Sequence, residues 1–133
     1  MTDLVNHPKH YTTHPSGVEA IEITRWLRGP YSNAFKYVFR GWDGLKDDPV
    51  QELRKAIWYL NDAEKFPNYG QDVPCEAMDQ WELLYDSETD RDKAECMRWI
   101  ICASMHEDVD YPPVEFLSLA KKLIQDRIAS LQS

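Results

Sequence analysis

The stretch that decides the fold is "DPVQELRKAIWYLNDA", residues 48–63. It opens with an acidic residue at Asp48, a proline next and Gln51 at the third helical position, an order typical of helix starts. Apolar residues then recur at helical spacing, which predicts an amphipathic helix to about Ala63. Its buried stripe is predicted to consist of Leu53, Ala56, Ile57 and Leu60. The opposite side carries Lys55, Trp58, Tyr59 and Asp62.

Helical periodicity continues on both sides of this stretch. A capping-box pattern at residues 16–19 predicts a helix ending near Arg28, and a second helix is expected over about 32–40, ending at Gly41. After a turn-rich segment at residues 65–74, helices are expected near 75–85, 90–106 and 113–131. The last has one apolar stripe made of Leu117, Ala120, Ile124, Ile128 and Leu131. The fold class is therefore predicted as all-α, a compact bundle of about five or six helices.

Length and composition predict one folded domain, residues 1–133, in a reducing compartment. The chain is 43% hydrophobic and 12% aromatic, which is ordinary for a globular protein. Its three cysteines form no C-x-x-C pair, and no run approaches the roughly 18 consecutive apolar residues of a membrane span. The first residues lack a basic-then-apolar signal pattern, so a cytoplasmic location and no membrane partner are expected.

Charge is unevenly distributed along this acidic chain, whose net charge is −8. Residues 67–110 hold three Lys or Arg against twelve Asp or Glu, whereas residues 1–46 hold six against four. Binding to long nucleic acid depends on many cationic contacts and is therefore not expected. A small phosphate ligand, held by a few local cations in the first third of the chain, is compatible with this balance.

The predicted helix over about 32–40 carries such cations on one face. On a helical wheel four polar side chains fall within about 100° of one another; they are Asn33, Lys36, Tyr37 and Arg40. An amide and a phenol are suited to a base or sugar, and an Arg–Lys pair to phosphate. The alternative is an ordinary solvent-exposed face.

The segment "NHPKHYTTHPSG", residues 6–17, is expected to be a loop-like N-terminal arm because its prolines disfavour helix and strand. A zinc site formed by His7, His10 and His14 has possible spacing, but no cysteine or fourth ligand lies nearby in sequence, so it is not favoured. Glu19 and Glu22, neighbours on one helix flank, are candidate magnesium ligands, although acidic residues are favoured in a first turn in any case.

Four blocks of the chain occur in the order of a known family. "HPKHY", "GVEAIEI", "NAFKYVFR" and "ELRKAIWYL", spread over residues 7–60, resemble a small bacteriophage family catalogued as a domain of unknown function. That family includes a coliphage nucleoside monophosphate kinase without a Walker motif. The resemblance implies a nucleotide-site core at 7–63, and the turn-forming composition and helical periodicity that follow predict a linker at 64–74 and a C-terminal helical extension at 75–133.

The resemblance also implies the site residues. The positions that it marks as important are His10, Tyr11, Glu19, Glu22, Asn33, Lys36, Tyr37, Arg40, Lys55 and Tyr59. All of them except the two glutamates are expected to bind the ligand, and Glu19 or Glu22 would hold the magnesium ion that a kinase needs. We expect His10 and Tyr11 to fold over the polar face of residues 33–40. Two departures stand out: the family's Ala-Gly and lysines after the third block are replaced by residues 41–46, "GWDGLK", and residues 67–133 match nothing in it.

Three functions remain open from the sequence. The first is a phage nucleoside monophosphate kinase that lacks a P-loop and uses Arg40, Lys36 and magnesium to hold phosphate. The second is a non-catalytic sponge that sequesters a nucleotide defence signal, such as a cyclic nucleotide, inside the infected bacterium. The third is a helical adaptor that binds a host protein. A homo-oligomer is also expected, because Trp42, Trp58 and Tyr59 would otherwise leave an exposed apolar patch.

Overall fold

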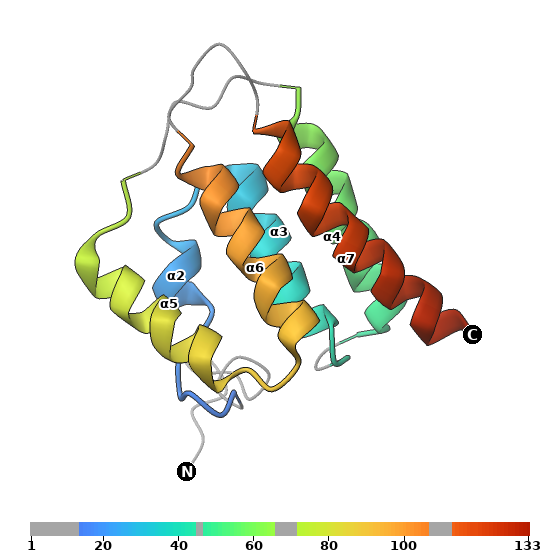
Figure 1. The fold of residues 1–133 in the computed structure, drawn as a ribbon, viewed down its shortest axis with the longest axis horizontal. Helices are drawn as coiled ribbons and strands as arrows, with labels where there is room; N and C mark the ends of the chain where they lie inside the picture. The colour runs from blue at the N-terminus through green and yellow to red at the C-terminus, as the bar shows by residue number, and fades with distance from the viewer. Residues whose placement is uncertain (1–13, 45–46, 66–71, 107–112) are drawn as a thin grey trace.

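The computed structural model describes residues 14–44, 47–65, 72–106 and 113–133, and within them it contains six α-helices and no strand. The predicted all-α class is therefore confirmed (Figure 1). The helices are α2 (Ile21–Thr24), α3 (Gly29–Gly41), α4 (Pro49–Ala63), α5 (Cys75–Ser87), α6 (Arg91–Ser104) and α7 (Val114–Gln132). None of the helices in these ranges is long and apolar enough to cross a membrane.

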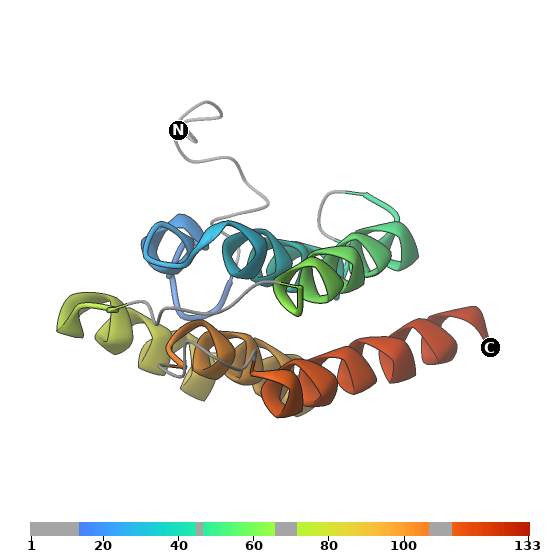
Figure 2. The same ribbon diagram turned by 90° about the horizontal axis from the view of Figure 1, so that it is seen from above.

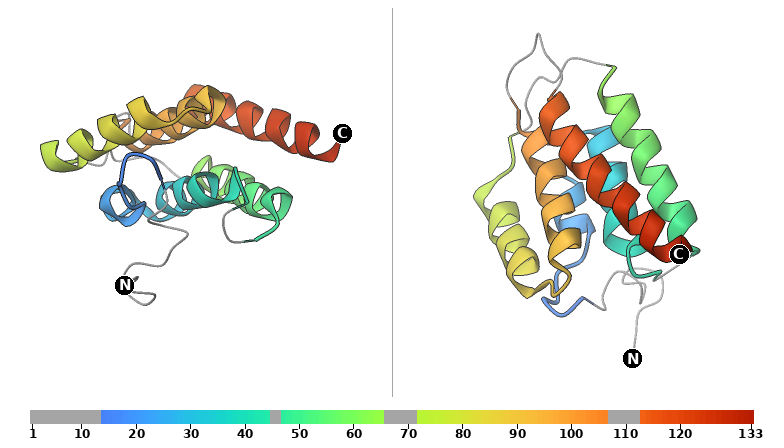
Figure 3. Two further views of the ribbon diagram at one scale, coloured as in Figure 1. Left: turned by 90° about the horizontal axis from the view of Figure 1, so that it is seen from below. Right: turned by 45° about the vertical axis from the view of Figure 1, so that its right-hand side comes forward.

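The helices form two layers. Figure 2 shows α2, α3 and α4 in one layer and α5, α6 and α7 in the other. Across the layers α2 packs on α5, α3 on α6 and α4 on α7, and within the layers α3 packs on α4 and α6 on α7. The same two layers are visible from below in the left panel of Figure 3. Each half of the chain therefore covers the apolar face of the other.

The core between the layers draws on both halves of the chain. Phe35 and Phe39 of α3 and Leu53 and Leu60 of α4 are fully buried. From the other layer the buried residues include Met97, Ile100, Leu117 and Ile124. All of them belong to one hydrophobic cluster, so the C-terminal half completes the core of the N-terminal half.

Most helix starts follow the predicted signals. Asp48 caps α4, its side chain accepting from the Val50 N–H at 3.0 Å. Asp90 caps α6 in the same way. The helix α3 begins three residues earlier than expected, at Gly29, because Pro30 fits the first turn of a helix, where its missing N–H has no partner to lose.

The first predicted helix is the main correction among the elements. Only Ile21–Thr24 is α-helical, because Gly17 takes a φ of +76°, in the left-handed region that a helix cannot include. The Ser16 hydroxyl accepts from the Val18 N–H, and the Glu22 carboxylate accepts from the Glu19 N–H at 3.0 Å. The capping interactions thus lie in and around a short turn.

Two apolar residues lie in a different environment from the one that the sequence predicts. Trp42, expected to be exposed, is only 1% exposed, since α6 and α7 cover it. Its indole N–H donates to Asp90 at 2.8 Å, and the Arg127 guanidinium donates to its carbonyl oxygen. Leu131 was placed on the buried stripe of α7 but is exposed, because the last turn extends beyond the core.

Candidate functional site

The helices α3 and α4 approach each other closely where Gly41 meets Glu52. A Cβ built on Gly41 would lie 2.5 Å from the Glu52 Cβ, a distance that real contacts do not show. Only glycine therefore allows the two backbones to come this near without a shift. The close approach encloses the Glu52 side chain, which is 0% exposed.

A buried carboxylate requires a partner, and Glu52 has two. The Arg40 Nε donates to one of its carboxylate oxygens at 2.8 Å, and the Lys55 Nζ lies 3.5 Å from the other. Arg40 is itself 6% exposed, whereas the Lys55 side chain is half-exposed. Glu52 thus ties one cation from each helix to a single point between α3 and α4.

Two tyrosines continue this arrangement toward solvent. The ring of Tyr37 stacks on that of Tyr59, with centroids 5.8 Å apart and planes 14° from parallel. Three cations lie within 5.5 Å of the Tyr37 centroid: the Lys36 Nζ and the Arg40 Cζ at 4.9 Å, and the Lys55 Nζ at 5.5 Å. We call Lys36, Tyr37, Arg40, Glu52, Lys55 and Tyr59 the Tyr37 cluster.

The Tyr37 cluster has a positive charge balance, with three cations against one carboxylate, in a protein of net charge −8. Three like charges around one ring repel one another, and the faces of aromatic rings and a single carboxylate offset this only in part. An anionic ligand group would complete the balance. Guanidinium and ammonium groups beside each other are a common arrangement for phosphate or carboxylate.

The structure brings together five of the site residues expected from the sequence, namely Lys36, Tyr37, Arg40, Lys55 and Tyr59. Among the described residues it does not bring Asn33 into these contacts, because the Asn33 amide nitrogen donates to the Gly29 carbonyl oxygen of its own helix. His10 and Tyr11 lie outside the described residues, and their predicted position over the polar face stays a prediction.

The candidate magnesium ligands have a local role in the structure. The Glu22 carboxylate accepts from the Glu19 N–H, so it caps the turn before α2. Within the described ranges, no group of three or more His, Cys, Asp or Glu side chains is arranged to hold a metal ion. Magnesium binding by Glu19 and Glu22 stays a prediction.

One expectation about the site was wrong and one residue was missed. Arg40 shares a polar helix face with Asn33, Lys36 and Tyr37, and such a face is expected to be open to solvent, but Arg40 is buried and Glu52 holds its guanidinium. Glu52 was missed because an acidic residue in a first helical turn is usually a solvent-exposed one. The signal that points to it is its spacing of three residues before Lys55, which places both on the same helix face.

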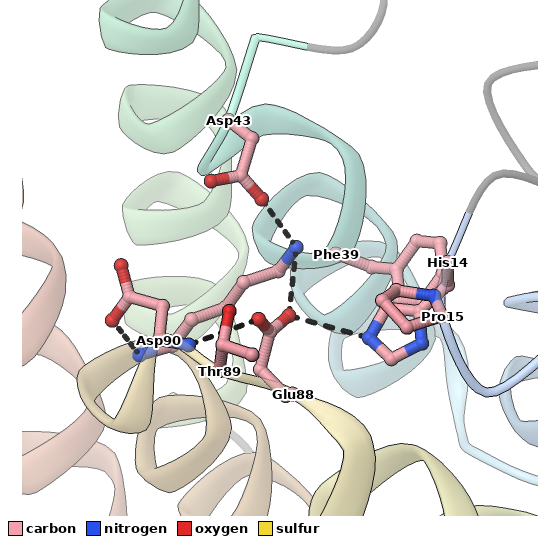
Figure 4. A pocket seen from close by; sticks show the side chains of 8 residues that line it. His14, Pro15, Phe39, Asp43, Glu88, Thr89 and Asp90 are labelled. Atoms are coloured by element: carbon pink, nitrogen blue, oxygen red, sulfur yellow. Dashed lines mark hydrogen bonds and ion pairs between the residues drawn. The ribbon is translucent and has the colours of Figure 1, made fainter.

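A second polar group, at a pocket that Phe39 also lines, joins the two layers. The pocket has a volume of about 270 Å³, and its lining side chains, drawn in Figure 4, are His14, Pro15, Phe39, Asp43, Glu88, Thr89, Asp90 and Lys93. The Lys93 ammonium, on a residue 2% exposed, lies 2.8 Å from Asp43 and 3.2 Å from Glu88. The His14 Nε2 lies 3.3 Å from the same Glu88 carboxylate.

The charged groups that line this His14 pocket pair with one another: Lys93 with Asp43 and Glu88, and Glu88 with His14. Burial lowers the pKa of His14 below its ordinary value, and Lys93 lowers it further, although Glu88 opposes the change. Lys93 in turn donates to Asp43, which follows α3 in the chain. We therefore interpret the His14 pocket as a polar connection between the layers, and the Tyr37 cluster as the candidate ligand site.

Comparison with known proteins adds one match. A family model described as a protein of unknown function (DUF3310) matches residues 5–61, slightly less than half of the chain. No curated protein and no solved structure matches the chain. The matched residues include α2, α3 and nearly all of α4, and with them the whole Tyr37 cluster. Glu88 and Lys93 of the His14 pocket lie outside the match.

Proposed function

We propose that this protein binds a nucleoside phosphate at the Tyr37 cluster. The observation that carries the proposal is the convergence of Lys36, Arg40 and Lys55 on the Tyr37 ring, which itself stacks on Tyr59. Cations supply the contacts that a phosphate needs, and the tyrosine phenols supply hydrogen-bonding groups for a sugar or base. Such a ligand is anionic at one end and aromatic at the other.

The size and charge of the cluster favour a small ligand. Long nucleic acid needs many cationic contacts, and the chain as a whole is strongly acidic. Repulsion from the surrounding carboxylates falls off over about 10 Å in ordinary salt, so a few local cations are sufficient for a mononucleotide. The proposed ligand is therefore a mononucleotide, in agreement with the resemblance described above.

The proposed reaction is phosphorylation of a nucleoside monophosphate. In such a step the bond between the β- and γ-phosphates of a nucleoside triphosphate breaks, and a phosphate oxygen of the monophosphate takes up the γ-phosphoryl group, leaving two diphosphates. Lys36 and Arg40 would neutralise developing charge on the transferred group, and magnesium would assist them. Sequestration of an unaltered nucleotide, the sponge function, needs the same binding contacts without turnover.

The proposal is tested by binding and product analysis on the same purified protein. The protein is mixed with a nucleotide extract from infected cells, washed and denatured, and the released compounds are identified by mass spectrometry. A parallel incubation with ATP and magnesium reports conversion of monophosphates to diphosphates. Diphosphate formation supports the kinase, and release of an unaltered cyclic or other nucleotide supports the sponge.

Variants connect the result to the Tyr37 cluster. Lys36→Ala removes a half-buried cation and Lys55→Ala an exposed one, and each is expected to weaken nucleotide binding by about ten-fold or more, the scale of a charge-assisted hydrogen bond. Lys122→Ala is the matched control, because Lys122 is an exposed lysine on α7 that pairs with Asp126. If all three variants bind nucleotide with the affinity of the wild type, the Tyr37 cluster is not the binding site. Retention of no nucleotide by the wild type would instead favour the protein-binding adaptor.

A further inference from the structure

Trp58 is the most exposed large hydrophobic residue among those described, with 62% of its surface accessible. It lies on α4, next to Tyr59 and three residues after Lys55. An indole in this position contributes little to the core. Covering it with a ligand would remove apolar surface from water, which is favourable. Its neighbours indicate which ligand.

The Trp58 ring is the outer end of a row of three aromatic rings. Trp58 meets Tyr59 with centroids 5.0 Å apart and planes at 82°, an edge-to-face contact. Tyr59 in turn stacks on Tyr37, around which the cations gather. In an edge-to-face pair one ring covers at most one face of the other, so Tyr59 leaves at least one face of the indole uncovered.

We propose that Trp58 stacks the base of the nucleotide whose phosphate binds Lys36 and Lys55. The proposal rests on the proposed function and adds the position of the base and the class of ligand. Residues three apart on a helix have their Cβ atoms about 5–6 Å from each other, so the side chains of Lys55 and Trp58 leave α4 as neighbours. A nucleotide likewise carries an anionic phosphate and an aromatic base on one sugar, so the two groups could meet these two side chains.

Stacking on an indole selects for the size of the base more than for its hydrogen-bonding edge. Every base has a π-face, and a purine offers a larger one than a pyrimidine. The site is therefore expected to bind purine nucleotides more tightly than pyrimidine nucleotides, with only small differences in affinity within each class. A sugar phosphate that lacks a base binds through the cations alone.

The experiment compares two variants with three ligands by isothermal titration calorimetry. Trp58→Leu removes the aromatic face and Trp58→Phe keeps a smaller one; the ligands are GMP, UMP and ribose 5-phosphate. In Trp58→Leu we expect affinity for GMP to fall about ten-fold, affinity for UMP to fall less, and affinity for ribose 5-phosphate to stay unchanged. Trp58→Phe should recover most of the loss. Trp26→Leu, at another exposed tryptophan, is the matched control.

The outcomes separate this proposal from the one on which it rests. If Trp58→Leu binds GMP as the wild type does while Lys36→Ala weakens it, the stacking role of Trp58 is wrong and the phosphate site stands. A parallel loss for GMP and ribose 5-phosphate would show that Trp58 acts on the shape of α4 instead, and would also overturn the stacking role. If the wild type binds none of the three ligands, both proposals fail, and Trp58 becomes a candidate contact for a protein.

Discussion

Replacing Arg40 with methionine is expected to destabilise the protein by about 3 kcal/mol, although methionine fills much of the same volume. Arg40 is 6% exposed and its partner Glu52 is 0% exposed, with 2.8 Å between the Arg40 Nε and the carboxylate oxygen. Removing one member of a buried ion pair leaves a buried charge and costs about 3–5 kcal/mol. The lower value applies here because the Lys55 Nζ remains 3.5 Å from Glu52.

The assay is urea unfolding of four proteins: the wild type, Arg40→Met, Glu52→Gln and the double variant. For a chain of this length a loss of about 3 kcal/mol lowers the midpoint of thermal unfolding by about 10 °C. The sum of the stability losses in the two single variants should exceed the loss in the double variant by about 2 kcal/mol, since the double variant leaves no buried charge without its partner. Lys122→Met, at an exposed pair, is the control and should change stability by less than about 0.5 kcal/mol.

Additive losses, with a coupling free energy below about 0.5 kcal/mol, would show that Arg40 and Glu52 do not pair in the folded protein. In that case Glu52 does not hold the Arg40 guanidinium. The same measurement therefore decides whether Glu52 positions the Arg40 side chain in the proposed phosphate site.

Two further predictions concern the contacts on either side of α3. Gly41→Ala should destabilise the protein by about 1–3 kcal/mol in urea unfolding, because its Cβ would meet Glu52, whereas Gly29→Ala, with open space around it, should be neutral or slightly stabilising. Burial lowers the pKa of His14, so the unfolded chain binds its proton more readily and stability should decline as pH falls through about 6.5. His14→Gln should flatten that part of the pH profile of the unfolding midpoint; an unchanged slope would contradict the assigned burial.

Local sequence signals accounted for most of the helices. A cap such as Asp48 and the spacing of apolar residues act within a few turns, so they are readable without a partner helix. The exception is the short α2, where the pattern at residues 16–19 resembles a helix start but Gly17 takes a left-handed conformation. A capping pattern does not reveal the backbone angle of the glycine inside it.

The sequence by itself determined which side chains share a helix face, including Lys36, Tyr37 and Arg40. Periodicity fixes such neighbours because the rotation per residue is constant. Which residues pack against each helix face was decided only by the packing of the two layers. It buried Trp42 under α6 and α7 and enclosed Glu52 between α3 and α4, because burial depends on contacts between residues far apart in the chain.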